Sequence, residues 1–353
     1  MKKTLIALAA VAATGAFAQS SVQIDGVMDA GYQAIDYKGN KVNGVNGNGS
    51  TTSQVNFRGV SDLGGGLKAD FRVETDWNTV GNKANTGSTA SAGAAPVTAA
   101  SFGNGEIRTG LAGGFGKVQF GAINNNTLIA NLTGQPFGTA IGSGHGAVIR
   151  SNSAGNAVRS DNSFQYISPV FSGFDVSYLQ ANQQNKANSA NFSSTLGAYQ
   201  QAGVKEASVS YTNGPLAARF TNLKEDNVST TDTTVNTLGA NYALGAAKVF
   251  LWTQTNKSAD GTTRNIAATT VSASYTMGQT VLMAQAGSAK NKLTNKTSNL
   301  ASVGADYNLS KTTALYGRYE SIKDEGGVIA AAATIDGTGT TRTRLGLGIR
   351  TAF

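Results

Sequence analysis

Hydrophobic and polar residues alternate with a period of two along much of this chain. In the segment 70–77, Phe71 and Val73 share one face, opposite four charged residues. The segments 54–58 and 342–353 repeat the pattern. A period of two is the spacing of a β-strand, in which successive side chains point to opposite sides. No long segment has a comparably clear helical pattern, so the chain is predicted to be all-β.

Sixteen alternating segments can be placed between clusters of Gly, Asn, Ser and Thr. We expect each of them to form one strand, and the fold class to be a transmembrane antiparallel β-barrel of 16 strands. The predicted strands are 21–35, 51–62, 67–78, 102–113, 116–125, 160–169, 172–181, 202–213, 215–225, 233–245, 247–257, 264–277, 279–289, 298–309, 312–323 and 342–353.

The connections between these strands favour a barrel over a soluble sandwich, which would also alternate. Tight, often Gly-containing turns are followed by longer polar loops, and this layout is typical of outer-membrane barrels. Closing the sheet removes its edges, which matters because every backbone N–H and C=O needs a partner in hydrocarbon. The tight turns are 63–66, 113–116, 168–171, 213–215, those at Gly245 and Gly278, and 309–312; the long loops include 36–50, 79–101, 126–159, 182–201 and 324–341.

The first 18 residues have the pattern of a secretory signal peptide. Lys2 and Lys3 precede an apolar stretch, and Ala16-Phe17-Ala18 has the small-x-small form of a cleavage site. We therefore expect residues 1–18 to be removed and 19–353 to form the barrel domain. Cleavage would leave 335 of the 353 residues and lower the formal charge from +8 to +6.

The composition supports a membrane barrel over a soluble domain. Charged residues make up only 14% of the chain, against about 25% in typical domains, yet no apolar run long enough for a membrane helix follows the leader. The chain has no cysteine, which excludes disulfides and thiolate sites. Its basic residues are scattered rather than clustered, so we expect no nucleic-acid partner.

Five motifs, in order, resemble the general porins of Gram-negative bacteria, and most closely their beta-proteobacterial branch. Together they span essentially the whole chain after the leader. The motifs are the opening strand 20–29, the hairpin 57–69 with the sequence FRGVSDLGGGLKA, the hairpin 110–121, the strand 159–169 and the closing strand 345–353.

The resemblance implies a homotrimer of sixteen-stranded barrels, each with a water-filled pore. In this family the third extracellular loop folds inward and narrows the pore, and it corresponds to about 124–159 here. A C-terminal Phe, here Phe353, serves the barrel-assembly machinery in the family. Outer-membrane lipid and lipopolysaccharide are further partners that the resemblance implies.

Charge at the narrowest point is expected to set the selectivity of such a pore. From 107 to 160 the chain has no Asp or Glu, whereas Arg108, Lys117, Arg150 and Arg159 are present. Family members usually oppose acidic groups on the inward loop to a basic ladder on the wall. The resemblance therefore implies that the acidic partner is missing from this loop.

Three arginines, Arg58, Arg72 and Arg108, fall on the polar faces of their strands and are predicted to point into the lumen. Three positions can be compared with related anion-selective members: Gln54 and the position near Gly105 stand where they carry an arginine, and Arg159 matches a third of their arginines. Alternatively, an arginine that faces the lumen has no role in ion selectivity and serves only to hydrate the wall or to pair with a charge on a neighbouring strand. The acidic residues predicted to share the lumen would offset part of the positive field; they are Asp25, Asp29, Asp70, Glu74 and Asp76.

These features predict an outer-membrane general diffusion porin that passes small hydrophilic solutes with a modest preference for anions. We expect no cofactor, metal or catalytic residue, because His145 is the only histidine and no phosphate-binding Gly-Lys-Ser/Thr motif is present. The alternatives are a substrate-specific outer-membrane channel, a non-channel adhesin or binding barrel, and an outer-membrane hydrolase built around His145.

Overall fold

The computed structural model describes residues 20–37, 40–77, 79–80, 102–145, 148–149, 158–182, 203–227, 231–324 and 341–353. The predicted leader 1–18 lies outside this range. No helix in the described part of the chain is long and apolar enough to cross a membrane.

The described residues form seventeen strands in one antiparallel sheet and one short helix. The strands follow one another around the sheet in sequence order, so that almost every strand pairs with its neighbours in the chain. The elements are β1 Ser21–Tyr37, β2 Asn40–Gly47, β3 Gln54–Gly64, β4 Leu67–Asp76, β5 Ile107–Gly113, β6 Gly116–Asn124, α2 Asn126–Thr133, β7 Arg159–Ile167, β8 Phe174–Ala181, β9 Gly203–Asn213, β10 Leu216–Asp226, β11 Thr233–Leu244, β12 Ala247–Ser258, β13 Asn265–Met277, β14 Thr280–Asn291, β15 Lys296–Asn308, β16 Thr313–Asp324 and β17 Arg342–Ala352.

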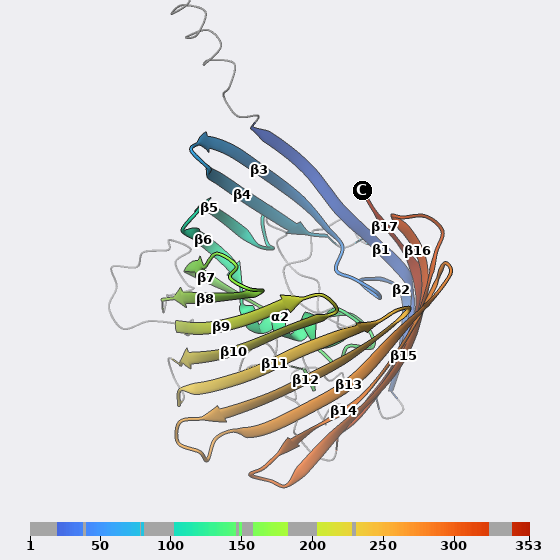
Figure 1. Cartoon of the computed structure of the whole chain (residues 1–353). Helices are drawn as coiled ribbons and strands as arrows, with labels where there is room; N and C mark the ends of the chain where they lie inside the picture. Colours follow the sequence, from blue (N-terminus) through green and yellow to red (C-terminus); the bar gives the residue numbers. More distant parts are fainter. Residues whose placement is uncertain are drawn as a thin grey trace, which may run out of the picture.

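The sheet closes on itself because β1 also pairs with β17 along eleven residue pairs, from Val27↔Ala352 to Tyr37↔Arg342. The strands β2 and β3 lie end to end along the other edge of β1. They therefore act as one interrupted strand, and the architecture is the predicted closed barrel of 16 antiparallel strands (Figure 1).

One predicted loop was wrong. The segment 36–50 was expected to be a loop, but β1 extends to Tyr37 and β2 occupies 40–47. The outward positions of β2 are Lys41, Asn43 and Val45, so the strand lacks the apolar alternation that identifies a lipid-facing strand. The antiparallel partner of the loop end of β1 is therefore β2, and the irregular segment is 48–53, which separates β2 from β3.

The other predicted strands agree with the structure to within three residues at each end, except that β5 begins at Ile107 instead of 102. Six of the seven predicted tight turns lie where they were predicted. The turn predicted at 168–171 lies instead at 171–174, where Phe171 and Phe174 exchange backbone hydrogen bonds of 2.8 and 2.9 Å. Gly214, Gly245 and Gly278 open two-residue hairpin loops with φ of 54°, 61° and 58°. Two-residue hairpins require such positive φ values, which glycine adopts without a steric penalty.

The barrel has its polar side chains inside and its apolar side chains outside. On β12, Val249 and Leu251 are exposed on the outer face, whereas Gln254, further along the strand and facing the lumen, is 3% exposed. On β11 the lumen-facing Thr237 is fully buried. This arrangement reverses that of a soluble domain, and it is the pattern required when lipid surrounds the wall.

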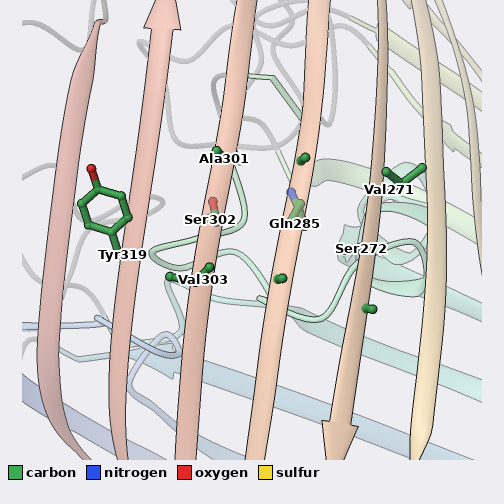
Figure 2. Close-up of a pocket in the computed structure, with 10 residues that line it drawn as sticks. Val271, Ser272, Gln285, Ala301, Ser302, Val303 and Tyr319 are labelled. Atoms are coloured by element: carbon green, nitrogen blue, oxygen red, sulfur yellow. The ribbon is translucent and has the colours of Figure 1, made fainter.

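Several small side chains lie on the outer face of β13 to β15. Alanines from β13, β14 and β15 leave a shallow hollow there, beside the ring of Tyr319 (Figure 2). Polar groups contribute little to its surface, so the hollow belongs to the lipid-facing side. Its lining consists of Val271, Ser272, Ala273, Ala284, Gln285, Ala286, Ala301, Ser302, Val303 and Tyr319.

A charge placed on this outer face should destabilise the barrel. Val303 lies near the middle of β15 and is 56% exposed on the outside. We expect Val303→Arg to lower the free energy of unfolding by about 2–4 kcal/mol, since an arginine near the bilayer midplane must be desolvated. The measurement is denaturant unfolding in lipid vesicles, followed by tryptophan fluorescence. Val303→Ala is the control for loss of the side chain, and an equal effect of both substitutions would contradict a lipid-facing position.

Candidate functional site

The chain enters the lumen directly after β6. Helix α2 packs against the inner wall formed by β9 to β12, as Figure 1 also shows. The fully buried Glu206 of β9 accepts hydrogen bonds from the backbone N–H of Asn126 (2.5 Å) and of Thr127 (2.6 Å), and from the Thr127 hydroxyl (2.6 Å). The first amides of a helix have no partner within the helix, and a carboxylate satisfies them and complements the helix dipole. Glu206 thus fixes the start of α2 to the wall.

The rest of α2 lies so close to the wall that one position there must be glycine. A Cβ atom on Gly239 of β11 would lie 1.8 Å from the carbonyl oxygen of Ala130. Two wall side chains hold the helix at this distance: Trp252 donates to Asn131 Oδ1 (2.7 Å), and Asn241 donates to the Thr133 carbonyl (2.8 Å).

A second carboxylate anchors the inward loop on the far side of the lumen. Glu320 of β16 accepts the backbone N–H groups of Gly142 (3.1 Å) and Gly144 (3.0 Å). Arg344 donates two hydrogen bonds of 2.8 Å to the same carboxylate, and Arg342 lies 3.3 Å from it. Because Glu320 is fully buried, its charge is compensated by these two guanidinium groups and the two amides.

The described residues of the predicted loop 124–159 therefore cross the lumen from β9 to β16. Two further contacts complete this path: Gln285 of β14 donates to the Ser143 carbonyl (3.0 Å), and the Ile141 N–H donates to the Gly49 carbonyl (3.3 Å). The loop covers the inner surface of β9 to β16. The inner wall formed by β3 to β7 faces it from the other side.

The wall of β3 to β7 carries most of the basic residues predicted for the pore, and each of them is paired with a carboxylate. Arg58 contacts Asp25 (2.9 Å), and Lys117 contacts Asp70 (2.9 Å). Arg108 also contacts Asp70. These charges lie on one face of adjacent strands and are spaced for pairing across the sheet.

Arg72 and Arg159 occupy the centre of this wall. Arg72 contacts Glu74 and lies 2.7 Å from Glu106, and it also donates to the Asn56 side chain (3.0 Å). Arg159 lies 3.5 Å from Glu74 and 3.6 Å from Asp76. These ion pairs join five basic side chains to five carboxylates. The ten side chains together therefore carry no net charge.

The remaining predicted residues are Gln54, Phe353 and Arg150. Gln54 opens β3 and is opposite Asp76 in the register. Phe353 exchanges two backbone hydrogen bonds of 3.0 Å with Gly26, and its ring is exposed on the outside. Arg150 falls outside the described residues.

Sequence reasoning missed several charged residues that organise the lumen. Glu106 is one of them: it lies just before the predicted acid-free segment 107–160, and a period of two places it on the same face as Arg108. The role of Glu206 and Glu320 could not be inferred, because their partners are backbone amides more than 70 residues away. Arg318 and Arg350, which both contact Asp306, were not predicted as pore residues.

His145 lies in the inward loop and is buried. Burial lowers its pKa to about 4, and the positive charge of Arg344 acts in the same direction. The imidazole is therefore neutral at neutral pH. Within the described segments, no group of three His, Cys, Asp or Glu side chains is placed to hold a metal ion.

Moving α2 away from the wall should narrow the pore. Gly239→Ala introduces a Cβ that collides with the Ala130 backbone, so we expect α2 to shift toward the lumen axis and single-channel conductance to fall. Gly317→Ala is the matched control, because its Cβ would meet only the flexible Leu347 side chain at 3.3 Å. Equal conductance of the two variants would contradict the packing described for α2.

His145 should make the loop sensitive to acid. Its pKa in the folded chain, about 4, lies below its ordinary value of 6.5, so its stabilising effect is complete above pH 6.5 and is lost as the pH falls toward 4. Between pH 7 and pH 4, the free energy of unfolding of the unmodified protein should fall by about 3 kcal/mol more than that of His145→Gln. The measurement is the free energy of unfolding of both proteins between pH 7 and pH 4, and parallel curves would contradict a buried neutral imidazole.

Comparisons with known proteins agree with this architecture. A family model described as Gram-negative porin matches residues 4–327. Outer membrane porin protein 32 of Delftia acidovorans is 31% identical over 385 aligned residues, which cover 100% of both chains.

Two solved structures share the fold. An anion-selective porin from Comamonas acidovorans superposes with a TM-score of 0.74 at 24% identity, covering 95% of this chain and 100% of that one. The trimer form of OmpT, an outer membrane protein of Vibrio cholerae, superposes with a TM-score of 0.68 at 15% identity, covering 95% and 99%. The family match, the full-length relative and the closed barrel together show that this chain belongs to the Gram-negative porin family and is a porin of the bacterial outer membrane.

Proposed function

We propose that this porin is a general diffusion channel for small hydrophilic solutes, with a modest preference for anions. The observation that supports it is a polar lumen in which the described residues of the predicted loop 124–159 are fixed against β9 to β16. The pore then lies between this loop and the wall of β3 to β7, which makes the loop the constriction. In this proposal Arg58, Arg72, Arg108 and Arg159 line the passage.

The balanced ion pairs explain why the preference would be modest. A cation and a carboxylate a few ångströms apart produce a weak field beyond about 10 Å at physiological salt. On the wall of β15 to β17, four arginines form ion pairs with the carboxylates of Asp306 and Glu320, so these six side chains together carry a positive excess. The porin of Comamonas acidovorans that shares the fold is anion-selective, and this supports the same sign. The four arginines are Arg318, Arg342, Arg344 and Arg350.

Assembly and processing are part of the proposal. A homotrimer is supported by the trimer form of the Vibrio cholerae protein. The exposed ring of Phe353 is available to the barrel-assembly machinery, and residues 1–18 would be removed during export. Passive diffusion requires neither a cofactor nor a catalytic residue.

The test is reconstitution of the full chain in a planar bilayer under a KCl gradient. We expect large current steps in groups of three and a reversal potential shifted toward that of chloride. A reversal potential near that of potassium would mean that the carboxylates dominate the field and would contradict the anion preference. Absence of conductance would contradict the channel itself, and block by micromolar solute would favour a substrate-specific channel.

A further inference from the structure

The barrel wall is interrupted beside β1, between its two partners on one edge. β1 pairs with β3 along its first seven residues and with β2 along its last eight, and the chain between these partners, residues 48–53, belongs to no strand. The side chain of Ser53 replaces the missing strand there. Its hydroxyl accepts the N–H of Asp29 (2.9 Å) and donates to the Asp29 carbonyl (3.2 Å). Because these backbone groups are hydrogen-bonded, segment 48–53 can leave the wall.

Segment 48–53 folds into the lumen, where the fully buried Asp29 holds it. The Asp29 carboxylate accepts three consecutive backbone N–H groups of the segment and the hydroxyl of Tyr316 (2.6 Å). Asn48, with a φ of 61°, turns the chain so that successive amides point at one anion. Four donors on one carboxylate fix the position of the segment. The three N–H donors belong to Gly49 (3.2 Å), Ser50 (2.8 Å) and Thr51 (2.8 Å).

On the side of β16 the segment meets the inward loop. The Gly49 carbonyl accepts the N–H of Ile141 (3.3 Å), and the Ser50 hydroxyl accepts a hydrogen bond from Arg318 (3.3 Å). Gly49 also packs so closely against Tyr316 that a Cβ atom on it would lie 2.5 Å from the phenol oxygen. The inner cover that the loop provides from β9 to β16 therefore continues across β17 to β1.

At its other end the segment meets the charged wall. The Ser53 carbonyl accepts the N–H of Trp77 (2.8 Å), the residue that follows Asp76 at the end of β4. Asp76 lies 3.6 Å from Arg159, one of the two arginines at the centre of this wall. Segment 48–53 thus joins the covered side of the lumen to the wall of β3 to β7, and it borders the space between them.

The segment presents neutral polar groups to the lumen. Ser50, Thr51 and Thr52 are partly exposed, and they lie inside the barrel because the segment is bonded to the lumen-facing Asp29 and to the inward loop. No residue of 48–53 is charged. The ten charged side chains of the neighbouring wall balance one another, so a single charge added to the segment would strongly change the local field.

From these contacts we propose that segment 48–53 is a second constriction element of the pore. Ser50, Thr51 and Thr52 line the passage beside the charged wall, and Asp29 is the positioning residue that holds them there. This role rests on the proposed function, because it adds a boundary to the same diffusion pore. The inward loop narrows the lumen from β9 to β16, and the segment narrows it from β16 to β3.

The first test places a charge on the segment. The full-length Thr52→Cys chain is recorded in a planar bilayer under a KCl gradient, before and after reaction with a positively or a negatively charged methanethiosulfonate. The chain has no cysteine of its own, so each reagent modifies this position alone. We expect the positive reagent to move the reversal potential toward that of chloride and the negative reagent to move it toward that of potassium, because the added charge lies in the narrow part of the pore.

The matched control is Thr262→Cys, because Thr262 is exposed in the turn between β12 and β13. Mass spectrometry checks the reaction of both variants, and the control should keep its reversal potential. No reaction at Thr52→Cys, no shift after reaction, or an equal shift in the control would overturn the proposal while the channel itself stands. Absence of conductance in the unmodified chain would contradict the proposed function, and this inference with it.

The second test releases the anchor. Asp29→Asn preserves the size of the side chain but leaves one acceptor oxygen, which cannot serve all four donors. In Thr52→Cys/Asp29→Asn we expect more open-channel current noise and a smaller shift of the reversal potential by either reagent than in Thr52→Cys alone. Thr52→Cys/Tyr316→Phe is the matched control. It removes one donor and leaves the three backbone N–H groups bound, so it should keep the full shift.

A second variant covers a failure of Asp29→Asn to fold. In Thr52→Cys/Gly49→Ala the new Cβ would meet the Tyr316 ring, so the same segment is displaced and the shift should again be smaller. A full shift in the Asp29→Asn and Gly49→Ala variants, or an equal loss in the Tyr316→Phe control, would overturn the positioning role of Asp29.

Discussion

The structure depends on one constraint: in hydrocarbon, each backbone N–H and C=O must be hydrogen-bonded within the protein. The pairing of β1 with β17 meets it by removing the edges of the sheet. Once the sheet is closed, alternate side chains point to lipid and to water, and the exposed Leu251 and buried Thr237 are direct consequences.

Inside the barrel the recurring interaction is a wall carboxylate that binds backbone amides of an inward segment. Glu206 holds the start of α2, Glu320 holds Gly142 and Gly144, and Asp29 accepts the N–H groups of Gly49, Ser50 and Thr51 at 2.8–3.2 Å. Three carboxylates are thus occupied with holding chain segments against the wall. Those segments need no charged side chains of their own, which explains how the inward loop can lack Asp and Glu.

The fold was largely predictable from the sequence because strand alternation and turn glycines are local. Where alternation is absent, as in the β2 segment around Asn43, the prediction was wrong. The candidate site was predictable only in part. Arg58, Arg72, Arg108, Lys117 and Arg159 do lie on one wall, but their pairing with carboxylates depends on register. The hydrogen bonds of Glu206 and Glu320 to backbone amides join residues 79 or more positions apart, and no local pattern encodes them.

The central claim is that the inward loop covers the wall of β9 to β16 and leaves the wall of β3 to β7 facing the pore. It can be tested with single cysteines, because the chain has none of its own. Arg58 has a side chain 45% exposed on the open wall, whereas Thr237 is 0% exposed behind α2. A charged methanethiosulfonate reagent should change the single-channel current of Arg58→Cys and leave that of Thr237→Cys unchanged. A current change in Thr237→Cys, or none in Arg58→Cys, would contradict this arrangement of loop and pore.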